Sequence, residues 1–222
     1  MNRAARDGDA AAQRGDRAPQ SADRAPQVLY LHGFRSSPQS YKAQRIGARM
    51  AALGLAARYA CPQLPESPAQ AVASITAAFA LTPEVALIGS SLGGFYATHL
   101  AERFGCRAVL LNPATDPAAT LAAHLGTQMP WHGGEAFEFR PEYLGELRAL
   151  EVAAITRPER YLLVAATGDE VLDWRQMVAR YPGARHEIVQ GSDHALTGFE
   201  RQLDDVLAFC SVDIDAAPPA PP

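Results

Sequence analysis

The chain has 222 residues, of which 48% are hydrophobic and 20% are charged, and its formal net charge is -4. This length fits one domain with a sizeable core, and the composition is typical of a soluble globular protein. The sequence has no long basic block and no run of about 18 apolar residues, so we expect neither a nucleic-acid partner nor a membrane span. Three widely spaced cysteines without a Cys-x-x-Cys pair indicate a reducing compartment, and we expect a cytoplasmic protein.

Both ends of the chain lack the large apolar side chains that a folded core needs. Residues 1–26 consist mainly of Ala, Arg, Asp, Gln and Gly, and residues 213–222 end in Ala and Pro. We predict that these tails are disordered and that residues 27–212 form one folded domain. Lys42 is the only lysine among 20 basic residues, which we interpret as a compositional bias of the genome without bearing on function.

The first half of the predicted domain alternates short apolar runs with helix-length segments. Val28–Leu31 is a candidate buried strand, and a helix is expected from about Pro38, with Ser37 as its N-cap and Gly54 as its end. A weaker strand at Ala56–Ala60, a helix opening at Ser67-Pro68, a strand at Val85–Ile88 and a helix ending near Phe104 follow.

The second half continues the same alternation. The expected strands are Ala108–Leu111, Tyr161–Ala165 and His186–Val189, and the expected helices are Asp173–Arg180 and Leu196–Phe209. Asp116-Pro117 and Pro141 open further helices in a coarsely defined middle segment. Uniformly apolar strands separated by helices predict an α/β fold with a mostly parallel sheet covered on both faces.

The segment Gly89-Ser90-Ser91-Leu92-Gly93 matches the pattern G-x-S-x-G between a predicted strand and a predicted helix. Gly89 and Gly93, two positions before and after Ser91, are small enough to allow the tight turn that exposes Ser91 as a nucleophile. The alternative, a phosphate-binding turn, lacks the G-x-x-x-x-G-K-[ST] and G-x-G-x-x-G patterns. We therefore interpret Ser91 as the candidate nucleophile, with the Leu92 amide at the helix start as an oxyanion donor.

A second oxyanion donor is expected in the loop after the first strand. His32-Gly33-Phe34 follows that strand, and Gly33 would let the chain turn so that the Phe34 amide faces the site. We expect His32 to brace this loop by hydrogen bonds and consider direct proton transfer by His32 the lesser alternative.

His194 is the candidate base, because it follows the last predicted strand in the chain order Ser, Asp, His. Asp169, after the preceding strand, is the candidate orienting acid, with Glu170 as the runner-up. Asp193 reads as a turn residue and Asp173 as an N-cap. No histidine has a partner at metal-ligand spacing, so we expect neither a metal nor a cofactor.

The expected insertion from Asp116 to Ile155 should shape the substrate pocket. Its aromatic side chains offer either an apolar acyl slot or buried packing, and the sequence leaves both open. These residues are Trp131, Phe137, Phe139 and Tyr143.

Six segments form a joint pattern over residues 27–209: Leu31-His-Gly-Phe-Arg-Ser-Ser-Pro38, Pro62-Gln-Leu-Pro65, Ile88-Gly-Ser-Ser-Leu-Gly-Gly94, Leu111-Asn-Pro-Ala114, Thr167-Gly-Asp-Glu-Val-Leu-Asp173 and His194-Ala-Leu-Thr-Gly-Phe-Glu200. Together they resemble the bacterial YqiA/YcfP-like esterases. The resemblance implies an α/β-hydrolase fold with a small or absent lid. It also implies activity on esters or acyl-CoA-type thioesters, with the family's triad on Ser91, Asp169 and His194. The two tails and residues 128–139 depart from the family pattern.

The function expected from the sequence is hydrolysis of a small-molecule carboxylic ester or thioester through an acyl-enzyme. A peptidase or amidase with the same triad is one alternative, and a non-catalytic binding module of the hydrolase fold is another. The sequence does not indicate the oligomeric state.

Overall fold

A six-stranded sheet forms the centre of the structure, which is a computed structural model describing residues 27–215. The strand order is β2-β1-β3-β4-β7-β8, and every neighbouring pair is parallel. The strands are β1 (Val28–Leu31), β2 (Tyr59–Ala60), β3 (Ala86–Ser90), β4 (Arg107–Leu111), β7 (Tyr161–Ala166) and β8 (Arg185–Val189). The predicted parallel sheet is confirmed.

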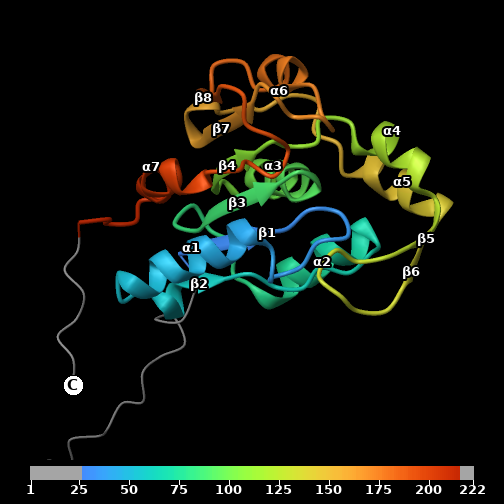
Figure 1. Cartoon of the computed structure of the whole chain (residues 1–222), viewed down its shortest axis with the longest axis horizontal. Coiled ribbons are helices and arrows are strands. Elements are labelled where there is room, and N and C mark those ends of the chain that lie inside the picture. The colour runs from blue at the N-terminus through green and yellow to red at the C-terminus, as the bar shows by residue number, and fades with distance from the viewer. Residues whose placement is uncertain (1–26, 216–222) are drawn as a thin grey trace, which may run out of the picture.

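Helices cover both faces of this sheet (Figure 1). Helices α1 (Tyr41–Ala52) and α7 (Leu203–Phe209) pack on one face. On the other face lie α2 (Pro68–Ala78), α3 (Leu92–Phe104) and α6 (Trp174–Arg180). Alternate residues of a strand point to opposite faces, so Leu29 and Leu31 join one core cluster while Val28 and Tyr30 join the other. The strands are apolar throughout because both of their faces are buried.

The chain between β4 and β7 forms a small insertion at the right-hand side of Figure 1. It contains α4 (Pro117–Leu121), the antiparallel pair β5 (Gly126–Gln128) and β6 (Phe137–Phe139), and α5 (Pro141–Ala149). Asp116 caps α4 by accepting a hydrogen bond from the Ala119 N–H, as the Asp-Pro signal predicts. The hairpin was not predicted, because strands of three residues carry too little periodicity to detect.

Three predicted elements need correction. Helix α1 begins at Tyr41 instead of Pro38, because Ser37 Oγ accepts the Gln39 N–H in a local turn and Ser40 takes the N-cap position. The weak strand at Ala56–Ala60 is mostly a 3-10 turn, and only its last two residues pair in the sheet.

The predicted helix from Leu196 to Phe209 is the third correction. Leu196 and Gly198 have positive φ angles, of 55° and 86°, which an α-helix excludes, and the regular helix begins only at Leu203. The predicted apolar face is nevertheless buried as a set: Leu196, Phe199, Leu203 and Val206.

The described residues, 27–215, can be compared with the predicted domain, residues 27–212. The predicted N-terminal tail and residues 216–222 lie outside the described residues. Residues 213–215 are described, and Ile214 packs against the core cluster that contains α7. Within residues 27–215, none of the helices has the length and apolar character needed to cross a membrane.

Candidate active site

Ser91 occupies the sharp turn between β3 and α3, with φ 54° and ψ -120°. A positive φ is rare for residues other than glycine and costs on the order of 1–3 kcal/mol. The surrounding backbone imposes this conformation: the Ser91 N–H donates to Leu111 O, and Ser91 O accepts from the amides of Gly94 and Ala114. The chain therefore holds Ser91 in a strained turn, which is the local geometry expected of a nucleophile elbow.

The glycines around Ser91 are required by close backbone contacts. A Cβ on Gly89 would lie 2.2 Å from Gly93 O, and one on Gly93 would lie 1.9 Å from Leu31 O. A Cβ on Gly33 would lie 3.2 Å from the Ser91 Cβ. These contacts bring the loop after β1 directly against the elbow, because no side chain separates the two backbones.

His194 and Asp169 form a direct pair at the carboxyl edge of the sheet. Nδ1 of His194 lies 2.8 Å from Oδ2 of Asp169, whose side chain is 0% exposed, whereas that of His194 is 23% exposed. The other Asp169 oxygen accepts the amides of Val171 and Leu172, each at 2.8 Å. Asp169 is thus fixed by the backbone while it holds one ring nitrogen of His194 and leaves the other ring nitrogen available.

Two other acidic residues near His194 have different partners. Glu170, the runner-up for the acid, accepts the His194 backbone N–H through Oε2 at 3.0 Å, whereas the ring is hydrogen-bonded to Asp169. Asp193 accepts the N–H and the hydroxyl of Thr197 and so closes a turn, as predicted. Asp169 is therefore the carboxylate that pairs with the His194 imidazole.

Asn112 supports the His194 loop and was not identified from the sequence. Its side chain is fully buried; Nδ2 donates to the carbonyls of Asp193 and His194, and Oδ1 accepts the Ala166 N–H. Its φ is 43°, a region that Asn tolerates better than most residues. Asn112 thereby connects the ends of β4 and β7 to the histidine loop. Only its place in the motif Leu111-Asn-Pro-Ala114 could have signalled this role.

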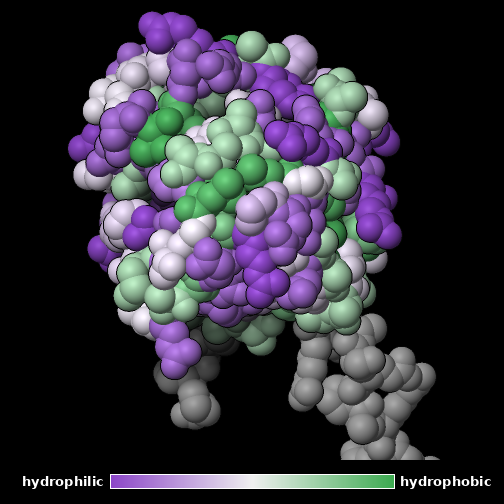
Figure 2. Space-filling view, turned by 90° about the vertical axis from the view of Figure 1, so that its right-hand side faces the viewer, coloured by the Kyte–Doolittle hydropathy of each residue, from purple (hydrophilic) through white to green (hydrophobic). Residues whose placement is uncertain are grey.

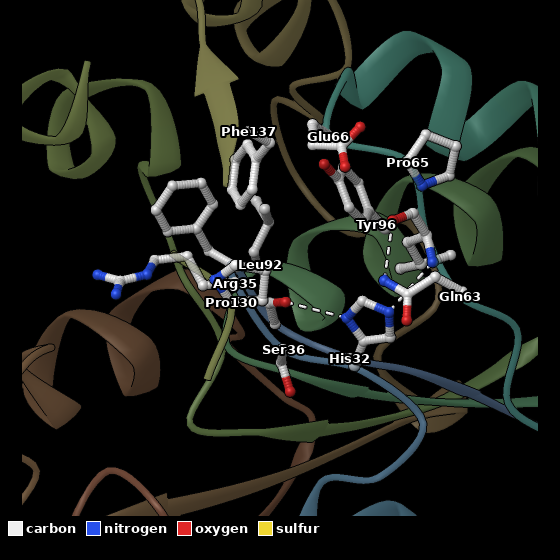
Figure 3. A pocket seen from close by; sticks show the side chains of 13 residues that line it. His32, Arg35, Ser36, Gln63, Pro65, Glu66, Leu92, Tyr96, Pro130 and Phe137 are labelled. Carbon is white, nitrogen blue, oxygen red and sulfur yellow. Dashed lines mark hydrogen bonds between the residues drawn. The ribbon is translucent and has the colours of Figure 1, made fainter. Parts of the chain in front are cut away.

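His32 braces the loop that carries the candidate oxyanion donor Phe34. Its Nε2 accepts the Leu64 N–H at 3.1 Å, so Nδ1 carries the proton and donates to Gly33 O at 3.0 Å (Figure 3). Burial lowers the pKa of His32, which favours this neutral form. The bracing contacts are those expected from the sequence, and both ring nitrogens are engaged in them.

The two candidate oxyanion donors come from different segments, Phe34 from the loop after β1 and Leu92 from the start of α3. Phe34 and Leu92 line a cavity together with Ser91 and His194. Leu92 is the first residue of α3, so its N–H has no acceptor within the helix and remains available to an anion.

Two cavities meet at Ser91. The first has a volume of about 240 Å³ and is lined by Ser91, His194 and mainly apolar side chains: Leu92, Ala114, Pro117, Leu121, Val171 and Leu172. The second, of about 500 Å³, also contacts Ser91 and His194, but its wall is more polar: Ser36, Ser40, Lys42, His132 and Glu170. The two cavities share Ser91 and His194, and the second carries more polar groups than the first; we call the first the apolar cavity and the second the polar cavity.

The β5–β6 hairpin is fastened to the loop after β1 through Arg35. Arg35 Nε donates to Met129 O at 2.6 Å, and the Trp131 N–H donates to Arg35 O at 2.8 Å. The Arg35 guanidinium also lies 4.1 Å from the centre of the Trp131 ring. Trp131 is 68% exposed and lines both cavities, so the hairpin brings an aromatic ring to their common border.

The four aromatic residues predicted for an acyl slot separate into two groups. Trp131 lines both cavities at Ser91, whereas Phe137 lines only a small neighbouring pocket beside His32 (Figure 3). Phe139 is buried, and the centre of its ring lies 5.0 Å from that of Phe34 and 5.6 Å from that of Tyr143. Phe139 and Tyr143 therefore serve the packing of the insertion. Figure 2 shows the side of the molecule that lies at the right in Figure 1, where the insertion is. On this face, hydrophobic residues gather in a central band between hydrophilic ones.

Three further histidines and the cysteines complete the candidate reactive groups. His124 lines the apolar cavity, while His99 and His186 bond to the carbonyls of Leu150 and Tyr181. All three cysteines are free, and burial raises the pKa of each thiol. Among residues 27–215, no cluster of three or more His, Cys, Asp or Glu side chains could hold a metal ion.

Solved structures similar to this chain share its fold. They include alpha/beta hydrolase domain-containing protein 10 from mouse (17% identity, 82% of this chain and 89% of that chain, TM-score 0.60). Est1E from Butyrivibrio proteoclasticus, with ferulic acid bound, has 16% identity over 86% of this chain and 91% of its own, with a TM-score of 0.61. The ydeN gene product from B. subtilis has 16% identity over 85% and 100% of the two chains, with a TM-score of 0.60.

These similarities, with the parallel sheet, identify the α/β-hydrolase fold that the sequence predicted. The family resemblance is confirmed as well, because a family model matches residues 27–211, which is nearly the whole described chain. The chain belongs to the uncharacterised protein family UPF0227, which is the YqiA/YcfP family.

Proposed function

We propose that this protein is a serine esterase that hydrolyses carboxylic esters or thioesters through an acyl-enzyme on Ser91. The observation that carries the proposal is the 2.8 Å pairing of His194 Nδ1 with Asp169 Oδ2 beside a cavity that both His194 and Ser91 line. A serine hydroxyl is a weak nucleophile unless a neighbouring base takes its proton, and the free Nε2 of His194 is that base.

In the proposed reaction, His194 Nε2 takes the hydroxyl proton of Ser91 as Oγ attacks the carbonyl carbon. The resulting oxyanion is held by the amides of Phe34 and Leu92, each worth about 100- to 1000-fold in rate. Asp169 stabilises the charged imidazolium. His194 then gives its proton to the departing alcohol or thiol, and a water molecule repeats the sequence to release the acid.

The apolar cavity is the proposed acyl site. Its volume of about 240 Å³ and its lining by Leu121, Leu172 and the rings of Phe34 and Trp131 suit a short aliphatic or a compact aromatic acyl group. The similar Est1E was solved with ferulic acid, so a feruloyl ester belongs in the substrate panel beside butyryl and longer aliphatic esters. The matching thioesters and amides separate the esterase proposal from the amidase alternative.

The test is labelling with a fluorophosphonate probe, followed by peptide mapping, together with hydrolysis of p-nitrophenyl butyrate. We expect the label on Ser91, and we expect Ser91→Ala to lose turnover while its melting temperature stays within a few degrees of the wild type. Ser74→Ala is the matched control, because Ser74 is exposed on α2 and lines neither cavity, so this variant should retain activity. Labelling elsewhere, or normal turnover by Ser91→Ala, would overturn the proposal.

We also propose a reducing compartment such as the cytoplasm. Cys106 and Cys210 are buried free thiols, Cys61 is partly exposed and free, and none of the three is paired.

A further inference from the structure

The polar cavity beside Ser91 contains donor groups that the proposed hydrolytic steps do not use. Lys42 is 8% exposed and contributes to the wall of this cavity, where its Nζ donates one hydrogen bond, to Ala195 O at 2.8 Å. An ammonium group has three N–H donors, so two of them remain for other partners. Ser40 lines the same cavity, where its buried Oγ lies near the Tyr30 hydroxyl but forms no hydrogen bond of good geometry within residues 27–215.

A buried ammonium group is costly unless an anion or several acceptors surround it. Lys42 forms no ion pair with any carboxylate of residues 27–215. The two acidic side chains whose charges act on it, Asp193 and Asp169, are bonded to Thr197 and to His194. Burial lowers the pKa of Lys42 to about 8, so the group is still mostly charged at pH 7. The cavity wall thus carries a buried positive charge that feels two nearby carboxylates but forms an ion pair with neither.

We propose that the polar cavity binds an anionic oxygen group, a carboxylate or a phosphate, carried by the alcohol or thiol part of the substrate, with Lys42 and Ser40 as its donors. This inference rests on the proposed function, because the apolar cavity takes the acyl chain and leaves the polar cavity for the departing group. The volume of about 500 Å³, twice that of the acyl cavity, accommodates a leaving group larger than a simple alcohol.

The other ionisable groups of the cavity wall are Tyr30, Tyr41, His132, Glu170 and His194. Glu170 is engaged with the His194 N–H, and Tyr41 donates its hydroxyl to Glu200. The Glu170 charge opposes an anionic ligand, whereas the Lys42 charge attracts it. Removing each charge separately should therefore change the selectivity in opposite directions.

The test compares two butyrate esters that differ only in the charge of the leaving group, 3-carboxyphenyl butyrate and 3-carbamoylphenyl butyrate. The wild type should prefer the carboxylate ester by about 10-fold or more in kcat/KM, since a buried charge-assisted hydrogen bond discriminates at least this much. Lys42→Met and Ser40→Ala should each lower that ratio, Lys42→Arg should retain part of it, and Glu170→Gln should raise it. A 3-phosphonophenyl ester tells whether a carboxylate or a phosphate fits better.

Arg58→Met is the matched control, because it removes one positive charge from an exposed side chain at the amino end of β2. Its ratio should equal that of the wild type. A wild-type ratio near one, or an unchanged ratio in Lys42→Met and Ser40→Ala, would overturn the subsite.

A binding measurement separates failure of the subsite from failure of the proposed hydrolysis. Calorimetry with Ser91→Ala measures the affinity for both esters without turnover. We expect tighter binding of the carboxylate ester and loss of that difference in Ser91→Ala/Lys42→Met. If neither ester is hydrolysed by the wild type but this difference is found, the esterase proposal fails and the anion subsite stands. Equal affinities for the two esters reject the subsite.

Discussion

The imidazole of His194 is held by a carboxylate that cannot move independently of the backbone, because Asp169 accepts two amides through one oxygen and His194 Nδ1 through the other. The Asp169 side chain is fully buried, so solvent does not compete for these bonds. The geometry fixes both the orientation of the ring and the tautomer with the proton on Nδ1. A base prepared in this way accepts a proton at Nε2, which is the atom that the proposed mechanism uses.

Asp169→Asn should lower kcat by up to about 10⁴-fold, because the amide can present its N–H to Nδ1 and select the wrong tautomer. Steady-state hydrolysis of p-nitrophenyl butyrate measures this loss. Glu170→Gln is the matched comparison, since it removes the neighbouring carboxylate, whose hydrogen bond is to the His194 backbone. We expect less than about 10-fold loss for that variant, in line with one weakened hydrogen bond. The reverse order of effects would assign the acid to Glu170.

Asn112 should affect both stability and catalysis through its three hydrogen bonds to the chain ends around His194. Asn112→Gly keeps a residue that tolerates φ 43° but leaves the Ala166 N–H without its acceptor. We expect a loss of about 1–3 kcal/mol in the free energy of unfolding, because a buried unsatisfied amide costs this much. Urea denaturation of the wild type and of Asn112→Gly measures this loss of stability.

The catalytic effect of Asn112→Gly separates positioning from general stability. If Asn112 positions the histidine loop, kcat should fall more than KM rises, and fluorophosphonate labelling of Ser91 should slow at temperatures where the variant is fully folded. Unchanged labelling of the folded variant would limit Asn112 to a structural role.

Gly93 is the position where the elbow tolerates no side chain, because an added Cβ would lie 1.9 Å from Leu31 O. Gly93→Ala should therefore push the helix start away from β1 and destabilise the fold by several kcal/mol, as overpacking against rigid backbone does. Gly145 provides the control: it lies inside α5, and an added Cβ meets nothing within 4 Å. Gly145→Ala should raise stability by about 0.5–1 kcal/mol, and thermal unfolding of both variants checks the contrast. Equal effects of the two substitutions would contradict this account.

The features that local sequence patterns encode were predictable. Buried strands such as Val28–Leu31, the cap at Ser67-Pro68 and the glycine pattern around Ser91 each depend on neighbours within a few residues. The positions of His194 and Asp169 after successive strands followed from topology, because parallel strands deliver their carboxyl ends to one edge of the sheet.

The remaining features depend on contacts between distant segments. Lys42 was interpreted as a product of genome composition, whereas the structure places it in a cavity wall with its ammonium group 2.8 Å from Ala195 O, 153 residues away in the chain. The hydrogen bond from Arg35 to Met129 O, which holds the β5–β6 hairpin, likewise joins residues 94 positions apart. Hydrophobic periodicity carries no information about such pairs, so neither the polar cavity nor the hairpin could be read from the sequence.

His32 should make the protein less stable in acid. Burial lowers its pKa in the folded state below the ordinary value of about 6.5, so the folded protein resists binding a proton that the unfolded chain accepts. The stability that depends on neutral His32 is fully present above about pH 6.5 and is lost as the pH falls toward the lowered pKa. In addition, a protonated Nε2 cannot accept the Leu64 N–H. His32→Gln keeps an acceptor without this titration, so urea denaturation at pH 7.5 and pH 5 should show a smaller decrease for the variant. Equal decreases would exclude His32 as the source.

Lys42 should make the protein more stable as the pH rises through the alkaline range. Its pKa is lowered to about 8 in the folded protein, whereas an unfolded lysine titrates near 10.4. Between these values the unfolded chain binds more protons, so the free energy of unfolding should rise with pH, by about 3 kcal/mol in total at about 1.4 kcal/mol per pKa unit. Below pH 8 the full cost of burying the charge is present.

Lys42→Met removes the buried charge and therefore lacks this rise. The difference in unfolding free energy between Lys42→Met and the wild type should be largest near pH 7 and should shrink steadily from pH 8 to pH 10.5. Arg58→Met, which changes the net charge equally at an exposed position, controls for the altered total charge. An anion that binds in the polar cavity stabilises the charged form of Lys42, so a saturating carboxylate ligand should reduce the alkaline rise in the wild type alone. Parallel stability curves for Lys42→Met and the wild type would mean that Lys42 keeps an ordinary pKa and that burying its charge costs no stability.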